Sequence, residues 1–338
     1  MKIQVKAEVL KLRHTFTIAH GSSDERVNLV VGLEHEGRVG WGLAAPNPRY
    51  GETPESCKAA LLAMARELQG DPRAYEPLIS SLLRNHEGEF AAKAALDMAI
   101  MDLAGKTLDA PLYRIWGLDP AGLSPTSMTI GMAAPEQVAQ RAQEAAGFHV
   151  LKVKLGSADD HALIEAIRSV TQVPIRVDAN EGWHSREHAI REVEWLAAHN
   201  VELVEQPMPA SAIEDAVWLK QRSPLPLIAD EAFTCNADLL SMGEAYHGVN
   251  IKLMKCGGTL MAREAVTLAR GLGLQIMLGC MVESSLGIAA AAQLAPYADY
   301  LDLDGNLLIC NDPFRGHAVI DGFLKLNDAP GLGASPLT

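Results

Sequence analysis

Short β-rich segments recur at a nearly constant interval along the chain after about residue 125. Each is an apolar run rich in Val, Ile and Leu, and successive segments begin 23 to 27 residues apart. Helical patterns separate them, for example at 185–200 and 259–273. The eight segments are 127–132, 150–156, 174–180, 201–207, 226–232, 249–255, 275–281 and 300–306.

Eight β/α units with one period predict an α/β fold of the (β/α)8 TIM-barrel type. An open, doubly wound parallel sheet is the alternative. It is disfavoured because no Gly-rich phosphate-binding loop follows the first segment and because the repeat stops at eight.

The N-terminal part of the chain has a different pattern. Two alternating segments joined by a turn at Glu36-Gly37 predict an antiparallel meander, and amphipathic helical patterns follow it. The segments are strands at 27–37 and 38–44 and helices at 55–69 and 89–106. The pattern is that of an α+β domain.

We therefore expect three regions. Residues 1–122 would form an α+β capping domain that carries specificity loops, and residues 123–310 would form the barrel with the metal and catalytic residues. Residues 311–338, which are rich in Pro and Gly, would be a tail that packs back on the capping domain.

Composition restricts the class of protein. The chain has 338 residues, 48% of them hydrophobic, which suffices for a large core in two domains. No apolar run reaches the ~18 residues of a membrane helix, and the N-terminus lacks the apolar region of a signal peptide. A net charge of −13 without a basic cluster disfavours nucleic acid or membrane as partner. Five cysteines without a CxxC pair predict a cytoplasmic protein with reduced thiols.

Carboxylates stand at the ends of three successive barrel strands. Asp178, Glu205 and Asp230 occupy equivalent positions, 27 and 25 residues apart. The catalytic residues of such barrels lie at the carboxyl ends of the strands. The three acids would therefore lie close together at one rim and repel one another. A divalent cation with oxygen ligands removes this repulsion, and Mg²⁺ suits a set of carboxylates. A helix-cap role would account for one such acid but is disfavoured for three in succession.

Lysines end the strands on both sides of this arc. Lys152 and Lys154 are two residues apart on the second strand and therefore point to the same side. The second and sixth strands of an eight-stranded barrel stand opposite each other, so Lys154 and Lys252 would face each other across the mouth. Such a pair places an acid/base on each face of a flat intermediate. We expect the cation and partial burial to lower their pKa values. Lys152 or Lys255 would instead pair with the acids or hold the substrate.

The eighth segment ends with two acids, Asp302 and Asp304, which point the same way. They would lie across the mouth from the metal, where two anions suit an ammonium group of the substrate. Taken alone, Asp304 is equally compatible with a cap or turn before Gly305.

The motifs KVK, VDAN, VEQP, ADE and NIK, in this order and at this spacing, resemble those of the enolase superfamily. The Lys-x-Lys motif and the sixth-strand lysine are similar to those of its muconate-lactonizing subgroup. The DxD of the eighth strand resembles that of the dipeptide epimerases. Members of this superfamily are known to use a Lys or His base with Mg²⁺ to stabilise an enediolate, so that property comes with the family and not from the spacing.

The resemblance covers nearly the whole chain and implies a role for each candidate residue. The implied ligands of one Mg²⁺ per subunit are Asp178, Glu205 and Asp230. The implied acid/base pair is Lys154 and Lys252. The implied substrate contacts are Lys152, Thr129, Asp302, Asp304 and, from the first capping loop, His20 and Arg26.

The implied activity is a 1,1-proton transfer that inverts the α-carbon of the C-terminal residue of a dipeptide. The closest pattern is that of L-Ala-D/L-Glu epimerases acting on murein-derived dipeptide in peptidoglycan recycling. Relatives specific for Ala-Glu tend to carry an arginine where His20 stands, and Arg26 lies further on. Because histidine binds a carboxylate less firmly than a bidentate guanidinium does, an epimerase of another L-Ala-Xaa dipeptide stays open.

The other interpretations are weaker. N-succinylamino acid racemases, o-succinylbenzoate synthases and cycloisomerases act on substrates without a free ammonium, which the two aspartates disfavour. A non-catalytic binding barrel is disfavoured by the complete sets of acids and lysines. The sequence leaves open the preferred dipeptide, a homo-oligomeric state, the enantiomer that each lysine serves, and the roles of Glu231 and Lys255.

Overall fold

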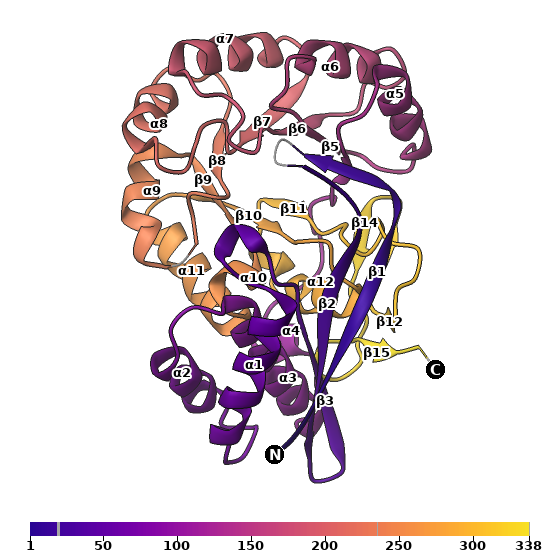
Figure 1. The fold of residues 1–338 in the computed structure, drawn as a ribbon, viewed down its shortest axis with the longest axis vertical. Helices are drawn as coiled ribbons and strands as arrows, with labels where there is room; N and C mark the ends of the chain where they lie inside the picture. Colours follow the sequence, from indigo (N-terminus) through magenta and orange to yellow (C-terminus); the bar gives the residue numbers. More distant parts are fainter. Residues whose placement is uncertain (19–20, 235, 338) are drawn as a thin grey trace.

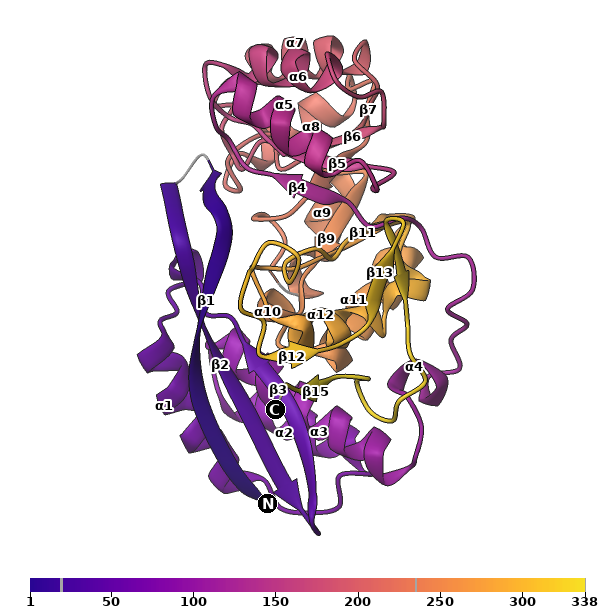
Figure 2. The same ribbon diagram turned by 90° about the vertical axis from the view of Figure 1, so that its right-hand side faces the viewer.

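A computed structural model describes residues 1–18, 21–234 and 236–337 of the chain. The molecule has two parts (Figure 1): a barrel of parallel strands with helices outside it, and a capping domain of antiparallel strands and helices at its mouth. The long N-terminal hairpin rises along the barrel toward its first strand (Figure 2).

The capping domain begins with a three-stranded antiparallel sheet in the order β1-β2-β3. Its strands are β1 (Lys2–Ile18), β2 (Gly21–His35) and β3 (Arg38–Ala44). β2 and β3 meet at the predicted turn, where Glu36 and Gly37 have φ values of 48° and 77°, as a tight two-residue hairpin requires. The helices that follow are α1 (Pro54–Met64), α2 (Tyr75–Asn85), α3 (Phe90–Thr107) and α4 (Leu112–Ile115).

Helix α3 packs directly on β3 because the strand carries glycine where the two backbones meet. A Cβ atom on Gly40 would lie 2.1 Å from the carbonyl oxygen of Ala99, and one on Gly42 would lie 1.9 Å from that of Ala95. Glycine therefore permits an approach that no side chain would allow. The helix is buried along most of its length and also contacts the barrel, so it forms the core between the two parts.

The barrel consists of eight parallel strands, hydrogen-bonded in chain order from β4 to β11. They are β4 (Met128–Ile130), β5 (Leu151–Lys154), β6 (Ile175–Asp178), β7 (Val201–Glu205), β8 (Leu227–Ala229), β9 (Gly248–Ile251), β10 (Gln275–Gly279) and β11 (Tyr300–Asp302). Seven of them lie within a predicted segment, and β9 begins one residue before its segment, 249–255. A parallel bridge between Thr126 and Leu301 joins the first and last strands. The predicted fold class is thus confirmed.

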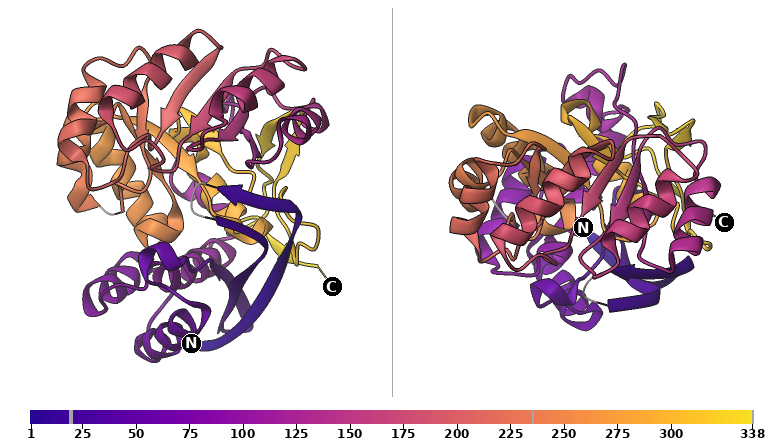
Figure 3. Two further views of the ribbon diagram at one scale, coloured as in Figure 1. Left: turned by 45° about the horizontal axis from the view of Figure 1, so that its top comes forward. Right: turned by 90° about the horizontal axis from the view of Figure 1, so that it is seen from above.

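Helices cover the outside of this sheet (Figure 3). They are α5 (Pro135–Glu144), α6 (Asp160–Arg168), α7 (Arg186–Ala197), α8 (Ile213–Lys220), α9 (Leu239–Ala245), α11 (Thr259–Gly271) and α12 (Ser285–Ala292). The short helix α10 (Leu253–Cys256) lies between β9 and α11 and contacts α3 of the capping domain. Because the strands are covered on one side by helices and filled by side chains on the other, they read as continuous apolar runs in the sequence.

The C-terminal tail contributes β12 (Phe314–Arg315), which pairs with β15 (Ser335–Pro336), and a hairpin of β13 (Ala318–Ile320) and β14 (Phe323–Lys325). It contacts the capping domain at several places, two of them on α3 and β3. The backbone N–H of Leu332 donates to Asp102 on α3 at 2.9 Å, and the ring of Phe314 packs edge-on against Trp41 of β3. In Figure 2 the tail accordingly lies beside β3.

Asp97 on α3 joins the capping domain to the barrel segment that follows Lys252. Its Oδ1 accepts hydrogen bonds from the backbone N–H and the hydroxyl of Thr259 at 2.6 and 2.7 Å, and its Oδ2 accepts one from the backbone N–H of Leu260 at 3.1 Å. A carboxylate from one domain thus caps the first turn of α11 in the other. Gly258 makes room, since a Cβ there would lie 2.3 Å from Cγ of Asp97.

No helix within the described ranges is both long enough and apolar enough to cross a membrane.

Replacing Asp97 by alanine should lower the free energy of unfolding by about 2–4 kcal/mol, because the helix loses its cap and buried donors lose their acceptor. Urea unfolding followed by circular dichroism measures the change. Asp71→Ala is the control. Among the described residues the only ion pair of this exposed aspartate is with exposed Arg73, so the substitution should leave stability nearly unchanged. Equal effects of the two substitutions would contradict the bridging role of Asp97.

Candidate active site

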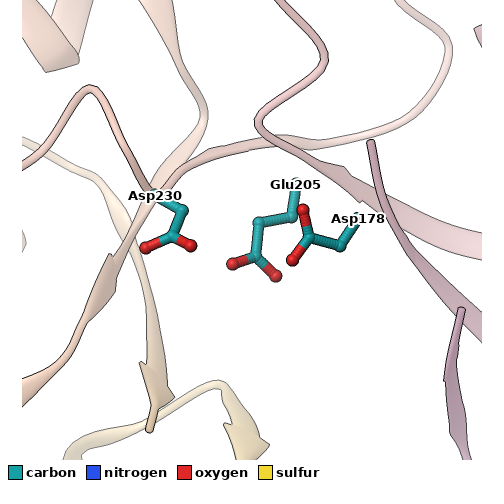
Figure 4. Close-up of side chains that lie close together, drawn as sticks. All are labelled: Asp178, Glu205 and Asp230. Atoms are coloured by element: carbon teal, nitrogen blue, oxygen red, sulfur yellow. The ribbon is translucent and has the colours of Figure 1, made fainter. Parts of the chain in front are cut away.

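The three predicted metal ligands converge at the carboxyl ends of adjacent strands. In the register of the sheet Asp178 on β6 is paired with Glu205 on β7, and Asp230 follows β8 directly. Figure 4 shows their carboxylates turned toward a common space. One oxygen of each lies within 4.8 Å of those of the other two, and all three residues are buried. The arrangement is a compact set of hard oxygen donors, as a divalent cation requires.

The lysines of β5 approach this triad from one side. Lys152 Nζ lies 2.6 Å from Glu205 Oε2 and 3.2 Å from Asp178 Oδ2, and it also lies 2.7 Å from Asp302 Oδ2. Lys154 Nζ lies 2.6 Å from Asp178 Oδ2. Lys152 therefore lies between the triad and Asp302, whereas Lys154 contacts Asp178 of the triad.

The lysines that follow β9 approach from the other side. Lys252 Nζ lies 2.7 Å from Asp230 Oδ2, and Lys255 Nζ lies 2.6 Å from Asp230 Oδ1. β5 and β9 are four strands apart in the eight-stranded sheet and so stand across the barrel from each other. Lys154 and Lys252 thus reach opposite ends of the triad. Lys255 has no exposed surface and holds the carboxylate of Asp230 in place.

The lysines do not compensate the three acids equally. Burial opposes ionisation, but two lysines beside each acid hold the pKa of Asp178 below its usual value and that of Asp230 well below it. For Glu205, burial together with the neighbouring Asp178 outweighs the lysines and raises the pKa to about 8. The central acid of the triad is therefore the least stabilised in its charged form, and a divalent cation would remove this imbalance.

The pKa of Lys252 differs from the sequence-based expectation. A lowered value is expected for a base near a cation, and burial does act in that direction. In the structure Asp230 and Glu205 outweigh burial, and the pKa of Lys252 is raised well above its usual value. The reason is that the full negative charge of the acids acts on the lysine, whereas a divalent cation on the same acids would offset it.

Asp302 and Asp304 lie at the end of β11. Asp302 Oδ1 accepts a hydrogen bond from the hydroxyl of Ser127 at 2.6 Å, and its Oδ2 pairs with Lys152. Asp304 Oδ2 accepts one from the backbone N–H of Thr129. Burial and the charge of Asp302 raise the pKa of Asp304 to about 6. Two crowded carboxylates therefore share one lysine, which favours a further cationic group beside them.

The polar groups around the triad fit a hydrated divalent ion. The amide of Asn180 donates to Glu231 Oε1 at 3.0 Å. The remaining oxygens of this pair, Asn180 Oδ1 and Glu231 Oε2, are buried and have no hydrogen-bond donor among the described residues. Asn180 lies two residues after Asp178, and Glu231 directly follows Asp230, so both are close to the predicted metal ligands. Because Mg²⁺ usually keeps several water ligands, whose protons need acceptors, these two oxygens suit such an ion.

The capping domain closes the barrel mouth into a cavity of about 730 Å³. Phe16 and Arg26 line it from the β1–β2 hairpin, and Tyr50 lines it from the 3₁₀ turn η1 (Pro48–Tyr50). The turn is fastened to the barrel by Arg49, whose two terminal nitrogens lie 2.7 and 2.8 Å from the carboxylate oxygens of Glu181. This bidentate ion pair joins the loop after β3 to the loop after β6.

The structure brings most of the candidate residues to this one cavity. Its walls include Lys152, Lys154, Asp230, Lys252, Thr129, Asp302, Asp304 and Arg26. Asp178 and Glu205 have no exposed surface and lie beside it, in contact with its lysines. His20 lies outside the described residues.

Sequence reasoning missed several polar residues of the site. Asn250, whose amide donates to Glu205 Oε1 at 2.7 Å, and Ser127 both lie two residues before a predicted site residue. Because residues two apart on a strand face the same side, this spacing could have identified both of them. Arg49 and Tyr50 belong to the stretch PNPRYGE, in which no spacing marks their contacts with the barrel.

Two family models match the chain. Residues 1–117 match the N-terminal domain of mandelate racemase / muconate lactonizing enzyme, and residues 135–337 match the enolase C-terminal domain-like family.

Similar proteins cover nearly the whole chain. An L-Ala-D/L-Glu epimerase of Bacteroides thetaiotaomicron is 45% identical over 98% of this chain and 87% of its own length. An L-Ala-D/L-amino acid epimerase of Pedosphaera parvula is 43% identical over 98% of this chain and 97% of its own. The structure of a dipeptide epimerase from Enterococcus faecalis, complexed with Mg and L-Leu-L-Tyr, is 32% identical with a TM-score of 0.93, over 99% of both chains. The chain therefore belongs to the mandelate racemase / muconate lactonizing enzyme family of the enolase superfamily, as its strand-end motifs predict, and is an isomerase of the racemase and epimerase class.

Proposed function

We propose that the chain is a dipeptide epimerase that interconverts L-Ala-L-Glu and L-Ala-D-Glu. One observation carries the proposal: Lys154 and Lys252 flank the acid triad from opposite strands and face the same cavity. Inversion of a carbon centre by proton transfer needs an acid/base on each face, whereas a single-face reaction needs only one. The names of the similar proteins support the same reaction class.

Mg²⁺ is the proposed cofactor, one ion per chain, with Asp178, Glu205 and Asp230 as the protein ligands. When bound, it supplies Lewis-acid stabilisation of the negative charge that develops on the substrate carboxylate. The Mg in the Enterococcus faecalis structure supports this assignment. Lys152, which lies between the triad and Asp302, is placed to neutralise the same carboxylate.

The residues of this chain then divide the reaction between them. One of the opposed lysines takes the α-proton of the C-terminal residue, and the other returns a proton to the opposite face. Asp302 and Asp304 bind the α-ammonium of the N-terminal residue, and Thr129 orients Asp304 through its backbone N–H. A succinylated or cyclic substrate without an ammonium would leave these two buried acids with Lys152 alone, so such substrates are disfavoured.

Arg26 supports an acidic side chain at the C-terminal position. It lines the cavity and is half-buried, and its guanidinium donates to the backbone carbonyl of Glu25. Among the described residues no carboxylate lies within ion-pair distance of it. A guanidinium in this position favours a carboxylate ligand. Another L-Ala-Xaa dipeptide is the second candidate, favoured by the size of the cavity.

With this substrate the chain would act on murein-derived dipeptide in peptidoglycan recycling. A cytoplasmic location and a homo-oligomeric state stay predictions from the sequence.

Proton exchange in D₂O tests the proposed reaction. With Mg²⁺ and either epimer of L-Ala-Glu, the chain should introduce deuterium at the α-carbon of the glutamate and form the other epimer, as seen by ¹H NMR. Lys154→Gln and Lys252→Gln should each slow epimerisation by about 10²–10⁴-fold. Because each lysine serves one face, each variant should retain exchange of one epimer only, and the two variants should retain different ones.

Lys58→Gln, at an exposed position of α1, is the matched control and should behave as the unchanged chain. No deuterium incorporation into any dipeptide would refute the proposed function. Exchange of both epimers by either lysine variant would refute the division of the two faces between the lysines.

Substitution of Arg26 tests the preference for glutamate. Arg26→Gln should lower kcat/KM for L-Ala-L-Glu by about 10–100-fold, the worth of a hydrogen bond to a charged group. It should change kcat/KM for L-Ala-L-Gln far less, because that side chain has no charge. Arg26→Lys keeps the charge, so its kcat/KM for L-Ala-L-Glu should lie between that of the unchanged chain and that of Arg26→Gln. Equal losses for both dipeptides would contradict a contact between Arg26 and the glutamate side chain.

A further inference from the structure

A second cavity lies beside the active-site cavity, and no step of the proposed reaction uses it. It has a volume of about 490 Å³ and is enclosed by β1, β4, α5 and the β13–β14 hairpin. Its lining is mainly apolar and includes Ile130, Ala145, Phe148 and Val319. We refer to it as the side cavity.

The side cavity shares a wall with the active-site cavity, because Phe16, Thr129 and Leu308 line both. The backbone N–H of Thr129 donates to Asp304 Oδ2, so one of the proposed ammonium-binding acids lies directly against this wall. Leu308 belongs to the loop that follows Asp304, and its carbonyl accepts a hydrogen bond from the backbone of β1 at Arg13. A group bound by the aspartates of β11 is therefore a neighbour of the side cavity.

The α-ammonium and the side chain of an N-terminal residue are attached to the same carbon atom. Binding of the ammonium at Asp302 and Asp304 therefore places that side chain close to the shared wall. We propose that the side cavity receives the side chain of the dipeptide's N-terminal residue, which enters between Phe16 and Leu308. The proposal rests on the dipeptide epimerase function and extends it to specificity at the N-terminal position.

Three charged groups around the side cavity have partners. Arg13 Nε and Arg141 Nη1 donate to backbone carbonyls at 2.9 and 3.3 Å, and Glu144 lies 3.4 Å from the imidazole of His14. Asp321, in the turn of the β13–β14 hairpin, also lines the side cavity and is exposed. Most of the remaining lining is apolar. An aliphatic or aromatic side chain gains from this environment, whereas a buried charge without a partner would be strongly unfavourable.

The size of the side cavity permits residues larger than alanine. A leucine side chain has four heavy atoms, each comparable to a water molecule with its share of ~30 Å³ in the liquid. The cavity of about 490 Å³ exceeds this requirement several-fold. We therefore expect N-terminal Leu, Met or Phe to be accepted as well as Ala.

Filling the side cavity from the wall farther from the active site tests the proposal. Ala145 follows α5 and lines the side cavity, and it is not part of the active-site lining. The unchanged chain should turn over L-Leu-L-Glu with kcat/KM within about tenfold of that for L-Ala-L-Glu. Ala145→Leu should lower kcat/KM for L-Leu-L-Glu by about tenfold or more, since apolar pockets discriminate 10–200-fold per methylene group. L-Ala-L-Glu should be converted as before.

Ala198→Leu is the matched control, because Ala198 occupies the same position after α7 but is exposed. It should leave kcat/KM unchanged for both dipeptides. Val319→Phe fills the side cavity from the β13–β14 hairpin and serves as a second filling variant if Ala145→Leu does not fold, as thermal unfolding would show. Phe16→Ala should widen the entrance and raise the ratio of kcat/KM for L-Leu-L-Glu over L-Ala-L-Glu about tenfold. Ala145→Leu in the same chain should cancel that gain.

The outcomes separate this proposal from the function on which it rests. Turnover of L-Ala-L-Glu with strong rejection of L-Leu-L-Glu by the unchanged chain would overturn the side-cavity assignment and leave the epimerase function intact. Filling variants that fold and lower kcat/KM equally for both dipeptides would also overturn the side-cavity assignment. No turnover of any dipeptide by the unchanged chain would instead overturn the epimerase function itself.

Discussion

Three buried carboxylates that meet at one end of the barrel impose the constraint on which the site depends. Asp178, Glu205 and Asp230 would repel one another without compensating charge, and burial removes the solvent that would otherwise reduce the repulsion. Lysines on both sides offset part of this charge, yet the pKa of Glu205 stays raised to about 8. A divalent cation would complete the balance, and the ion pairs with the acids hold the lysines in the positions from which we propose that they act on substrate.

The capping domain encloses the charged mouth of the barrel. The bidentate pair of Arg49 and Glu181 fastens one capping loop over the barrel, and Asp97 caps the helix that follows the Lys252 segment. Enclosure strengthens each electrostatic contact inside, because the competing solvent is excluded. In the proposed function the barrel supplies the groups for the reaction, while the hairpin β1–β2 and its neighbours would supply the surfaces that meet the two side chains of the substrate.

Much of the barrel and of its chemistry was predictable from the sequence because both repeat. A period near 25 residues indicates the eight strands, and the charges at the ends of six of them must lie at one rim. Contacts between distant segments carry no such period. No local sequence pattern indicates the features that form where the two domains pack together. These are the ion pair of Arg49, the helix cap by Asp97 and the side cavity. The raised pKa of Lys252 also depends on how closely the acids pack around it.

Calorimetric titration of Mg²⁺ into the substrate-free chain measures directly whether the three carboxylates bind a divalent cation. We expect one bound ion per chain, with binding abolished by Glu205→Gln and retained by Glu202→Gln, a partly exposed position on the same strand. Binding of one ion that survives Glu205→Gln, or no binding by the unchanged chain, would contradict the claim that the three carboxylates are arranged around a divalent cation.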